Sequence, residues 1–221
     1  MMSMSYLSLI VVTLVIGMGA TWWVNHQLKK YRSVGSASGY TGAQMAQHML
    51  SYHGVSGVEI RMGGPDQNHF DPRDNSITLD PDAYRGTSVT SIATACHEVG
   101  HACQFAEGYA PMRIRGSLVP AVNLASNAWI FLLMLGIIMN IAGLTTLAII
   151  MYAVVVLFQI VTLPVEFDAS RRAKAYLANV GAPVAEQGGT ASVLQACALT
   201  YVAAALTSIL QLLWLLGQRE E

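Results

Sequence analysis

Charged residues are scarce in this sequence, and they are missing altogether from three long stretches. Only 11% of the 221 residues are Asp, Glu, Lys or Arg, whereas a soluble globular domain carries about 25%. No charge precedes Lys29, none lies in the 50 residues between Arg115 and Glu166, and none lies in the 32 residues between Glu186 and Arg219. A helix needs about 20 apolar residues to cross a bilayer. The three stretches therefore predict one, two and one membrane spans, which excludes a soluble protein.

Basic tracts and paired cysteines are missing as well. The formal net charge is −1 and no long basic tract is present, so nothing predicts a nucleic-acid partner. The three cysteines form no CxxC pair, and Cys96 and Cys103 lie seven residues apart on one expected helix, too far apart for a disulfide. We therefore expect free thiols in a reducing compartment.

The four spans are expected at approximately residues 6–24, 118–139, 144–163 and 192–216, with a tight hairpin at the NIAG linker between the second and third. Basic residues follow the first span and flank the hairpin: Lys29, Lys30, Arg32, Arg113, Arg115, Arg171, Arg172 and Lys174. By the positive-inside rule, both polar inserts are then cytoplasmic, and both chain termini lie outside the plasma (inner) membrane.

These boundaries divide the chain into a transmembrane anchor, a cytoplasmic insert, a transmembrane hairpin, a cytoplasmic helix, and a fourth span with the C-terminal tail: residues 1–28, 29–115, 116–165, 166–191 and 192–221. Within the first insert, helical periodicity covers residues 40–51, with Thr41 as a cap, and residues 87–107, ending at Gly108. VEIRM alternates as a strand, and residues 76–79 are the best strand of a second extended piece. The expected fold is a mainly α polytopic membrane protein with a small α+β insert.

The second of these helices contains HEVGH at residues 97–101. On a helix, His97 and His101 are one turn apart and point the same way, so both imidazoles can bind one Zn²⁺ at about 2.0–2.1 Å. Glu98 is turned away from ligation but is close enough to take a proton from metal-activated water. Gly100 allows another segment to approach closely. The alternative is two helix histidines that are hydrogen-bonded to their neighbours.

A catalytic zinc needs three protein ligands and a water, so HEVGH alone is incomplete. The helix continues as ACQFAEGYAP, without a downstream G-x-x-H. Glu166, in TLPVEFDAS, is the first charge after the third span, where an acid is costly unless it is paired or ligates metal. Spacing alone leaves two interpretations open: a third ligand, or an ion pair with Arg171 or Lys174.

Three segments taken together resemble a known family. HFDPRDNSITLDPDAY, HEVGHACQ and LPVEFDASRRA, in this order and between hydrophobic spans, resemble the YugP-type membrane zinc metallopeptidases over nearly the whole chain. The resemblance implies a gluzincin-like enzyme with a zincin-like insert, in which His97, His101 and Glu166 ligate one Zn²⁺ per chain and Glu98 is the base. It also implies a third ligand on a helix downstream.

The sequence departs from the wider gluzincins at one place. The prenyl-protein and heat-shock membrane peptidases tend to carry an acid four residues after the ligand Glu, and this chain has Ser170 there. An acceptor is still needed to orient a ligand imidazole. We expect Asp71 or Asp168 to supply it, with turn or helix-surface roles as the alternative for both.

Peptide hydrolysis also needs a donor for the tetrahedral oxyanion besides the metal. The candidates are His69, Tyr84 and Tyr109, each with core packing as the alternative. The strand at residues 76–79 precedes the HEVGH helix, as the substrate-binding edge strand does in zincins. An extended peptide is therefore expected to pair with that strand through main-chain hydrogen bonds.

The resulting hypothesis is a zinc endopeptidase at the cytoplasmic membrane face, acting on membrane-associated peptides or proteins, with membrane protein quality control as a hypothetical role. The bilayer is the second expected partner, and no oligomeric state is predicted. The alternative is a catalytically silent zinc-binding scaffold or regulatory subunit. An intact Glu98 argues against this alternative, since structural zinc usually has four protein ligands and needs no unligated acid. A metal transporter is disfavoured because the spans contain no acid.

Overall fold

The computed structural model describes residues 6–218, and four long helices dominate it. They are α1 (Tyr6–Arg32), α5 (Ala110–Ile138), α6 (Ala142–Asn179) and α7 (Val184–Gly217), each long and apolar enough to cross a membrane. Four spans were predicted, and four candidate spanning helices are found in the described part of the chain. The hairpin predicted at NIAG is confirmed: α5 and α6 are joined by a short turn in which Asn140 has a positive φ of 53°.

Helix α6 extends well past the predicted third span. It has 38 residues and runs without a break through Pro164 and Glu166 to Asn179. About 20 residues are enough to cross the hydrocarbon layer, so much of the charged C-terminal half is surplus to a span. The segment expected as a separate cytoplasmic helix, residues 166–191, is instead shared between the second half of α6 and the first turns of α7, with a short turn between them.

The polar insert contains the remaining elements: α2 (Gly42–Tyr52), β1 (Glu59–Met62), β2 (His69–Asp71), β3 (Ser76–Leu79), α3 (Pro81–Arg85) and α4 (Val89–Ala106). Thr41 caps α2 as predicted and forms a capping box with Gln44. The Ser88 hydroxyl accepts a hydrogen bond from the Ser91 amide at the start of α4. Helix α3 was not predicted, although Asp80 followed by Pro81 is a typical helix start.

The three strands form one small sheet in the order β1-β3-β2. Strand β3 is central, parallel to β1 and antiparallel to β2, with Ile77 opposite both Ile60 and Phe70. The predicted edge position of residues 76–79 is therefore wrong. Three of the four β3 side chains are buried, which suits a central strand, and β2 takes the edge position on the α4 side.

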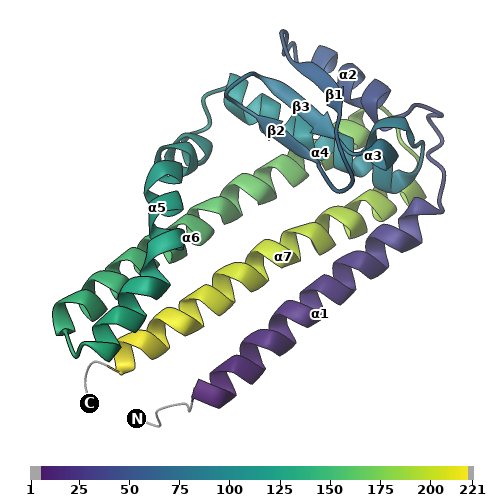
Figure 1. Cartoon of the computed structure of the whole chain (residues 1–221). Helices are drawn as coiled ribbons and strands as arrows, with labels where there is room; N and C mark the ends of the chain where they lie inside the picture. The colour runs from purple at the N-terminus through teal and green to yellow at the C-terminus, as the bar shows by residue number, and fades with distance from the viewer. Residues whose placement is uncertain (1–5, 219–221) are drawn as a thin grey trace.

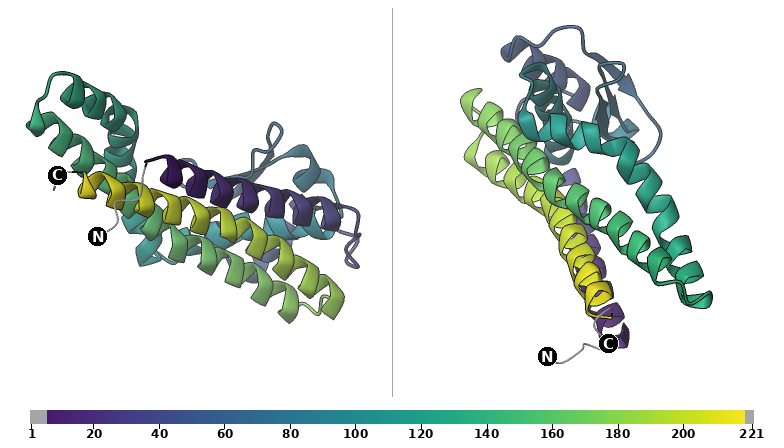
Figure 2. Two further views of the ribbon diagram at one scale, coloured as in Figure 1. Left: turned by 90° about the horizontal axis from the view of Figure 1, so that it is seen from below. Right: turned by 90° about the vertical axis from the view of Figure 1, so that its left-hand side faces the viewer.

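Helix α4 lies at the centre of the insert, with 14 of its 18 residues buried. Its apolar side chains form one core with α2, the sheet, the end of α6 and the start of α7. Figure 1 shows the sheet and α2–α4 gathered at one end of the long helices, with both chain termini at the other end. Figure 2 shows α1 alongside α7, and α5 paired with α6. The HEVGH helix is thus held against the polar ends of α6 and α7.

Candidate metal site

The two histidines of HEVGH project from the same face of α4. Their ring centroids are 4.7 Å apart and the rings are nearly perpendicular, so the two Nε2 atoms face a common point beside the helix. Gly100 lies on the side where α6 crosses. A Cβ at this position would lie 2.7 Å from the Ala169 carbonyl oxygen and 2.9 Å from Ala169 Cα. The close helix approach expected at Gly100 is therefore present, and it brings α6 next to both imidazoles.

Glu166 of α6 projects between the two histidines. Its Oε2 atom is 3.2 Å from His97 Nε2 and 3.6 Å from His101 Nε2. The ligand atoms of the three residues all lie within 4.8 Å of one another. Nitrogen and oxygen ligands at about 2.0–2.1 Å around a tetrahedral Zn²⁺ lie about 3.3 Å apart. The separations therefore fit a His₂Glu zinc site, and Glu166 makes no ion pair with Arg171 or Lys174.

Gln104 fixes the orientation of His101. It is completely buried, and its amide nitrogen donates to the Val165 carbonyl oxygen at 2.8 Å and to Asp168 Oδ2 at 3.0 Å. Both partners only accept, so the amide oxygen faces His101 Nδ1 at 3.0 Å, and that nitrogen must carry the proton. In neutral His101 the Nε2 lone pair then points toward the Glu166 carboxylate. Two acceptors at this distance require a cation between them.

The pKa of His101 reflects the same geometry. Burial acts to lower this pKa, but the Glu166 carboxylate 3.6 Å away and the negative charge of Glu98 outweigh burial, so the pKa is raised. A site that attracts a proton also attracts a metal cation, and the two compete for the same nitrogen.

The partner of His97 is Ser170, whose hydroxyl lies 3.2 Å from His97 Nδ1. Ser170 stands where the wider gluzincins tend to carry an acid, four residues after Glu166. The serine hydroxyl can accept the Nδ1 proton, which leaves Nε2 free for a metal. Both imidazoles are thus oriented by neutral side chains, and the two partners come from α4 itself and from α6.

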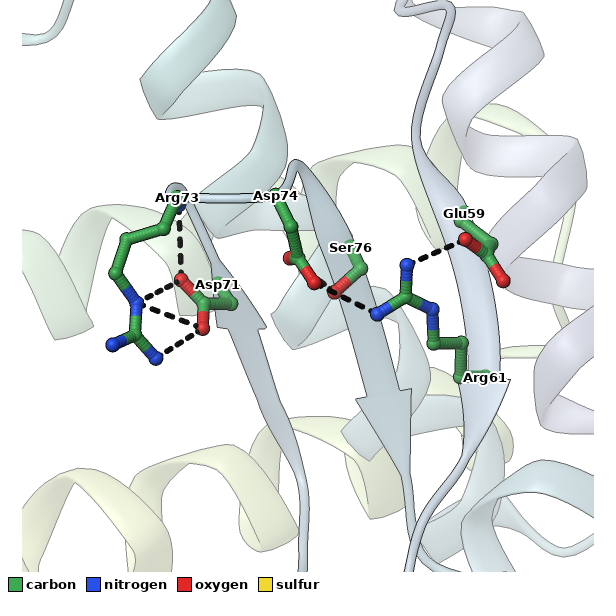
Figure 3. Close-up of polar contacts among 6 residues, drawn as sticks. All are labelled: Glu59, Arg61, Asp71, Arg73, Asp74 and Ser76. Atoms are coloured by element: carbon green, nitrogen blue, oxygen red, sulfur yellow. Dashed lines mark hydrogen bonds and ion pairs between the residues drawn. The ribbon is translucent and has the colours of Figure 1, made fainter.

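Of the two acids expected to orient a histidine, neither contacts an imidazole directly. Asp168 hydrogen-bonds Gln104 and pairs with Arg171 and Arg172, so it acts on His101 only through the Gln104 amide. The prediction that Asp71 accepts a hydrogen bond from a ligand imidazole is wrong. Figure 3 shows Asp71 turned to Arg73, whose side chain and backbone N–H hold the pKa of Asp71 at about 2. In the same view, Arg61 of β1 forms ion pairs with Glu59 on its own strand and with Asp74 in the turn that precedes β3.

A cavity of about 820 Å³ opens beside the site between β2, α4, α5, α6 and α7. His97, Glu98, His101 and Glu166 all line this larger cavity. The Glu98 side chain is buried from bulk solvent, yet among the described residues no group hydrogen-bonds its carboxylate. A smaller cavity of about 230 Å³ lies toward α1 and α3, and His97 and Glu98 line it too. The acid and the metal ligands therefore lie where the two cavities meet.

Two of the three candidate oxyanion donors line the larger cavity, and the third does not. His69 and Tyr109 line the larger cavity, whereas Tyr84 packs against the hydrophobic core and lines neither cavity, so it is not at the site. Tyr201 of α7 was not predicted, and it lines both cavities beside His97 and Glu98. No sequence signal marks a single tyrosine within an apolar span. Gln104 was also missed, although it lies three residues after His101, on the same side of α4.

Comparisons with known proteins show which family the chain resembles over most of its length. Residues 6–219 match the family model described as "Putative neutral zinc metallopeptidase". The chain is 38% identical over 205 residues to the "Putative membrane protease YugP" of Bacillus subtilis (strain 168), and this match covers 90% of the chain and 91% of the relative. No solved structure gives a significant match.

Proposed function

Since the chain belongs to the neutral zinc metallopeptidase family that matches residues 6–219, we propose that it is a membrane-embedded, zinc-dependent endopeptidase. His97 and His101 of α4 and Glu166 of α6 would hold one Zn²⁺ per chain. The observation that carries the proposal is the convergence of these three donors next to the buried, unpaired carboxylate of Glu98. A structural zinc site would usually have four protein ligands and would need no such acid.

When bound in such a site, Zn²⁺ acidifies water and polarises a carbonyl group. Glu98 accepts the proton that the attacking water loses and later delivers it to the leaving amine. Gln104 and Ser170 hold the imidazoles in the tautomer that presents Nε2. Tyr201, from a third helix, is placed to donate its hydroxyl proton to the substrate oxyanion, and His69 and Tyr109 are the other donors along the larger cavity.

The substrate would bind as an extended chain beside β2. This strand is the sheet edge next to α4, and all three of its residues line the larger cavity. An edge strand offers unpaired backbone groups to which a peptide adds by main-chain hydrogen bonds. The proposal moves the substrate strand from β3, where it was expected, to β2.

The larger cavity is also lined by Val119 and Pro120 of α5, a candidate membrane span. The polar insert lies at the same end of the long helices as the end of α1 and the start of α5 (Figure 1), and these helix ends carry Lys29, Lys30, Arg32, Arg113 and Arg115. We therefore assign the site to the cytoplasmic membrane face, where membrane-associated chains have access, as quality control of membrane proteins would require. The bilayer and a polypeptide substrate are the partners of this proposal.

The test compares purified wild type with Glu98→Gln in a non-ionic detergent, by zinc content and casein cleavage. We expect one zinc per chain in both proteins and a loss of cleavage of about 10²–10⁴-fold in the variant, since proton transfer by a positioned acid contributes that much. Glu59→Gln, at an exposed site on β1, is the matched control and should cleave normally. Full cleavage by Glu98→Gln would remove the catalytic role, and zinc binding without any wild-type cleavage would favour the scaffold alternative.

A further inference from the structure

Two arginines of α5 line the larger cavity without an acidic partner. Arg113 and Arg115 lie in the first two turns of α5, and their side chains border the same space as His97 and Glu98. Among residues 6–218, no carboxylate forms an ion pair with either guanidinium. By contrast, Arg73 of the insert pairs with Asp71, and Arg172 of α6 pairs with Glu107 and Asp168. The cavity thus holds two uncompensated positive charges.

Arg115 is the more constrained of the two. Its guanidinium lies over the Phe158 ring of α6, 5.6 Å from the ring centroid, within the range of a cation–π interaction. Its Nε atom is buried and has no hydrogen-bond partner among the described residues. A buried donor without a partner is costly, and more so on a cation. Arg113, by contrast, is exposed to solvent.

The remaining charges of the larger cavity leave the arginines unbalanced. Asp71 and Arg73 neutralise each other at the β2 turn. Glu98 and Glu166 balance the two positive charges of the proposed Zn²⁺. The smaller cavity has the opposite character, since Asp66, Asp80 and Asp82 line it with a single cation, Arg32, which pairs with Asp82. The catalytic residues therefore lie between a basic and an acidic compartment.

We propose that Arg115 binds a carboxylate side chain of the peptide substrate, so that the enzyme prefers Asp or Glu on one side of the scissile bond. This inference rests on the proposed peptidase function. A guanidinium whose N–H groups have no partner among the described residues can match a carboxylate with two parallel hydrogen bonds. The acidic smaller cavity would repel the same side chain, so the preference applies to one side only.

The position of Arg115 favours a peptide group over a lipid phosphate. Arg115, Glu98, Glu166 and Tyr201 all line the larger cavity, so Arg115 belongs to the surroundings of the proposed catalytic residues. A headgroup at the membrane surface would meet the exposed Arg113 first. A substrate chain that lies along β2 instead passes through the cavity that Arg115 lines.

The experiment maps cleavage sites in a proteome-derived peptide library by mass spectrometry and then measures kcat/KM on matched peptides that carry Asp or Asn at the preferred position. For wild type we expect Asp to be favoured by about tenfold or more, because a charge-assisted pair is stronger than a neutral hydrogen bond. Arg115→Gln should cleave both peptides at nearly equal rates, and Arg115→Lys should keep part of the preference. Arg85→Gln, at an exposed arginine outside both cavities, should behave as wild type.

Zinc content and thermal stability are measured for each variant, so that a failure of the Arg115 proposal can be distinguished from a failure of the peptidase proposal. A wild type without acidic preference, or an Arg115→Gln variant that retains it, would overturn the assignment. Each protein is also assayed in phospholipid vesicles of increasing anionic lipid content. If Arg115→Gln loses the same factor of kcat/KM on both peptides, and this loss grows with the anionic lipid content, Arg115 binds lipid headgroups and the proposal is overturned. If Glu98→Gln cleaves normally, the peptidase proposal fails instead, whatever the preference.

Discussion

At the scale of single residues, Gln104 does more to define the site than its neighbours in the sequence suggest. Its two amide protons are taken by Val165 and Asp168, so only its oxygen is left for His101. The i, i+4 spacing was enough to predict that His97 and His101 face one point. Nothing in a single sequence distinguishes Gln104 from a surface glutamine, because its acceptors come from α6, more than sixty residues away.

We predict that Gln104→Leu weakens zinc binding by about 10–100-fold, as loss of an outer partner of a ligand histidine typically does. The leucine would fill the space but would leave the Nδ1 proton of His101 without an acceptor. The measurement is zinc competition with a chromophoric chelator in detergent. Gln47→Leu, on the exposed side of α2, is the control. Equal zinc affinity in wild type and Gln104→Leu would show that the histidine is oriented by other contacts.

At the scale of elements, the crossing of α4 and α6 sets the metal geometry. Gly100 leaves room for the Ala169 backbone, and the same crossing places Glu166 opposite both imidazoles. Periodicity predicted α2, α4, β1 and β3, but it predicted neither α3, nor β2 as a separate strand, nor the order of the sheet. Whether residues 76–79 lie at an edge or in the centre depends on pairing with β1, which is parallel and distant in sequence. The continuity of α6 was also missed, because Pro164 and the charged residues that begin at Glu166 are features that usually mark the end of a membrane span.

We expect Gly100→Ala to lower stability by about 1–3 kcal/mol, the usual cost of overpacking, because its methyl group would meet backbone atoms that cannot rotate away. The shift of α6 should also weaken zinc binding. Gly188→Ala in α7 is the matched control, since a Cβ there meets nothing within 4 Å, and its melting temperature should not fall. A Gly100→Ala protein as stable as wild type, with normal zinc affinity, would show that this crossing is not restrictive.

At the scale of the whole molecule, the polar insert and the charged half of α6 meet at one end of the helices, and both termini lie at the other (Figure 1). The uncharged stretches of the sequence were enough to predict four spans, and the basic residues were enough to predict a common side for the two inserts. The contact between the first polar insert and the charged half of α6 could not be derived from the spacing of residues in the sequence. It depends on how α4 packs between the polar ends of α6 and α7.

The orientation in the membrane can be tested with reporter fusions in a bacterial host. A fusion after Gly217 should show alkaline phosphatase activity and little green fluorescent protein signal, since the C-terminus is expected outside. A fusion truncated after Gly39, behind α1 alone, should give the reverse result. A fluorescent C-terminal fusion would place the insert outside the cell and would refute the cytoplasmic assignment.

In the proposed site, a carboxylate from α6, a candidate membrane span, completes a metal site begun by two histidines of the insert. The decisive measurement is a zinc titration of purified Glu166→Ala against wild type, with thermal stability in the presence of chelator as the folding control. We expect the zinc affinity of Glu166→Ala to be lower by more than about 100-fold, which exceeds the usual effect of losing a hydrogen-bond partner of a ligand histidine. Unchanged zinc affinity in a folded Glu166→Ala protein would contradict it.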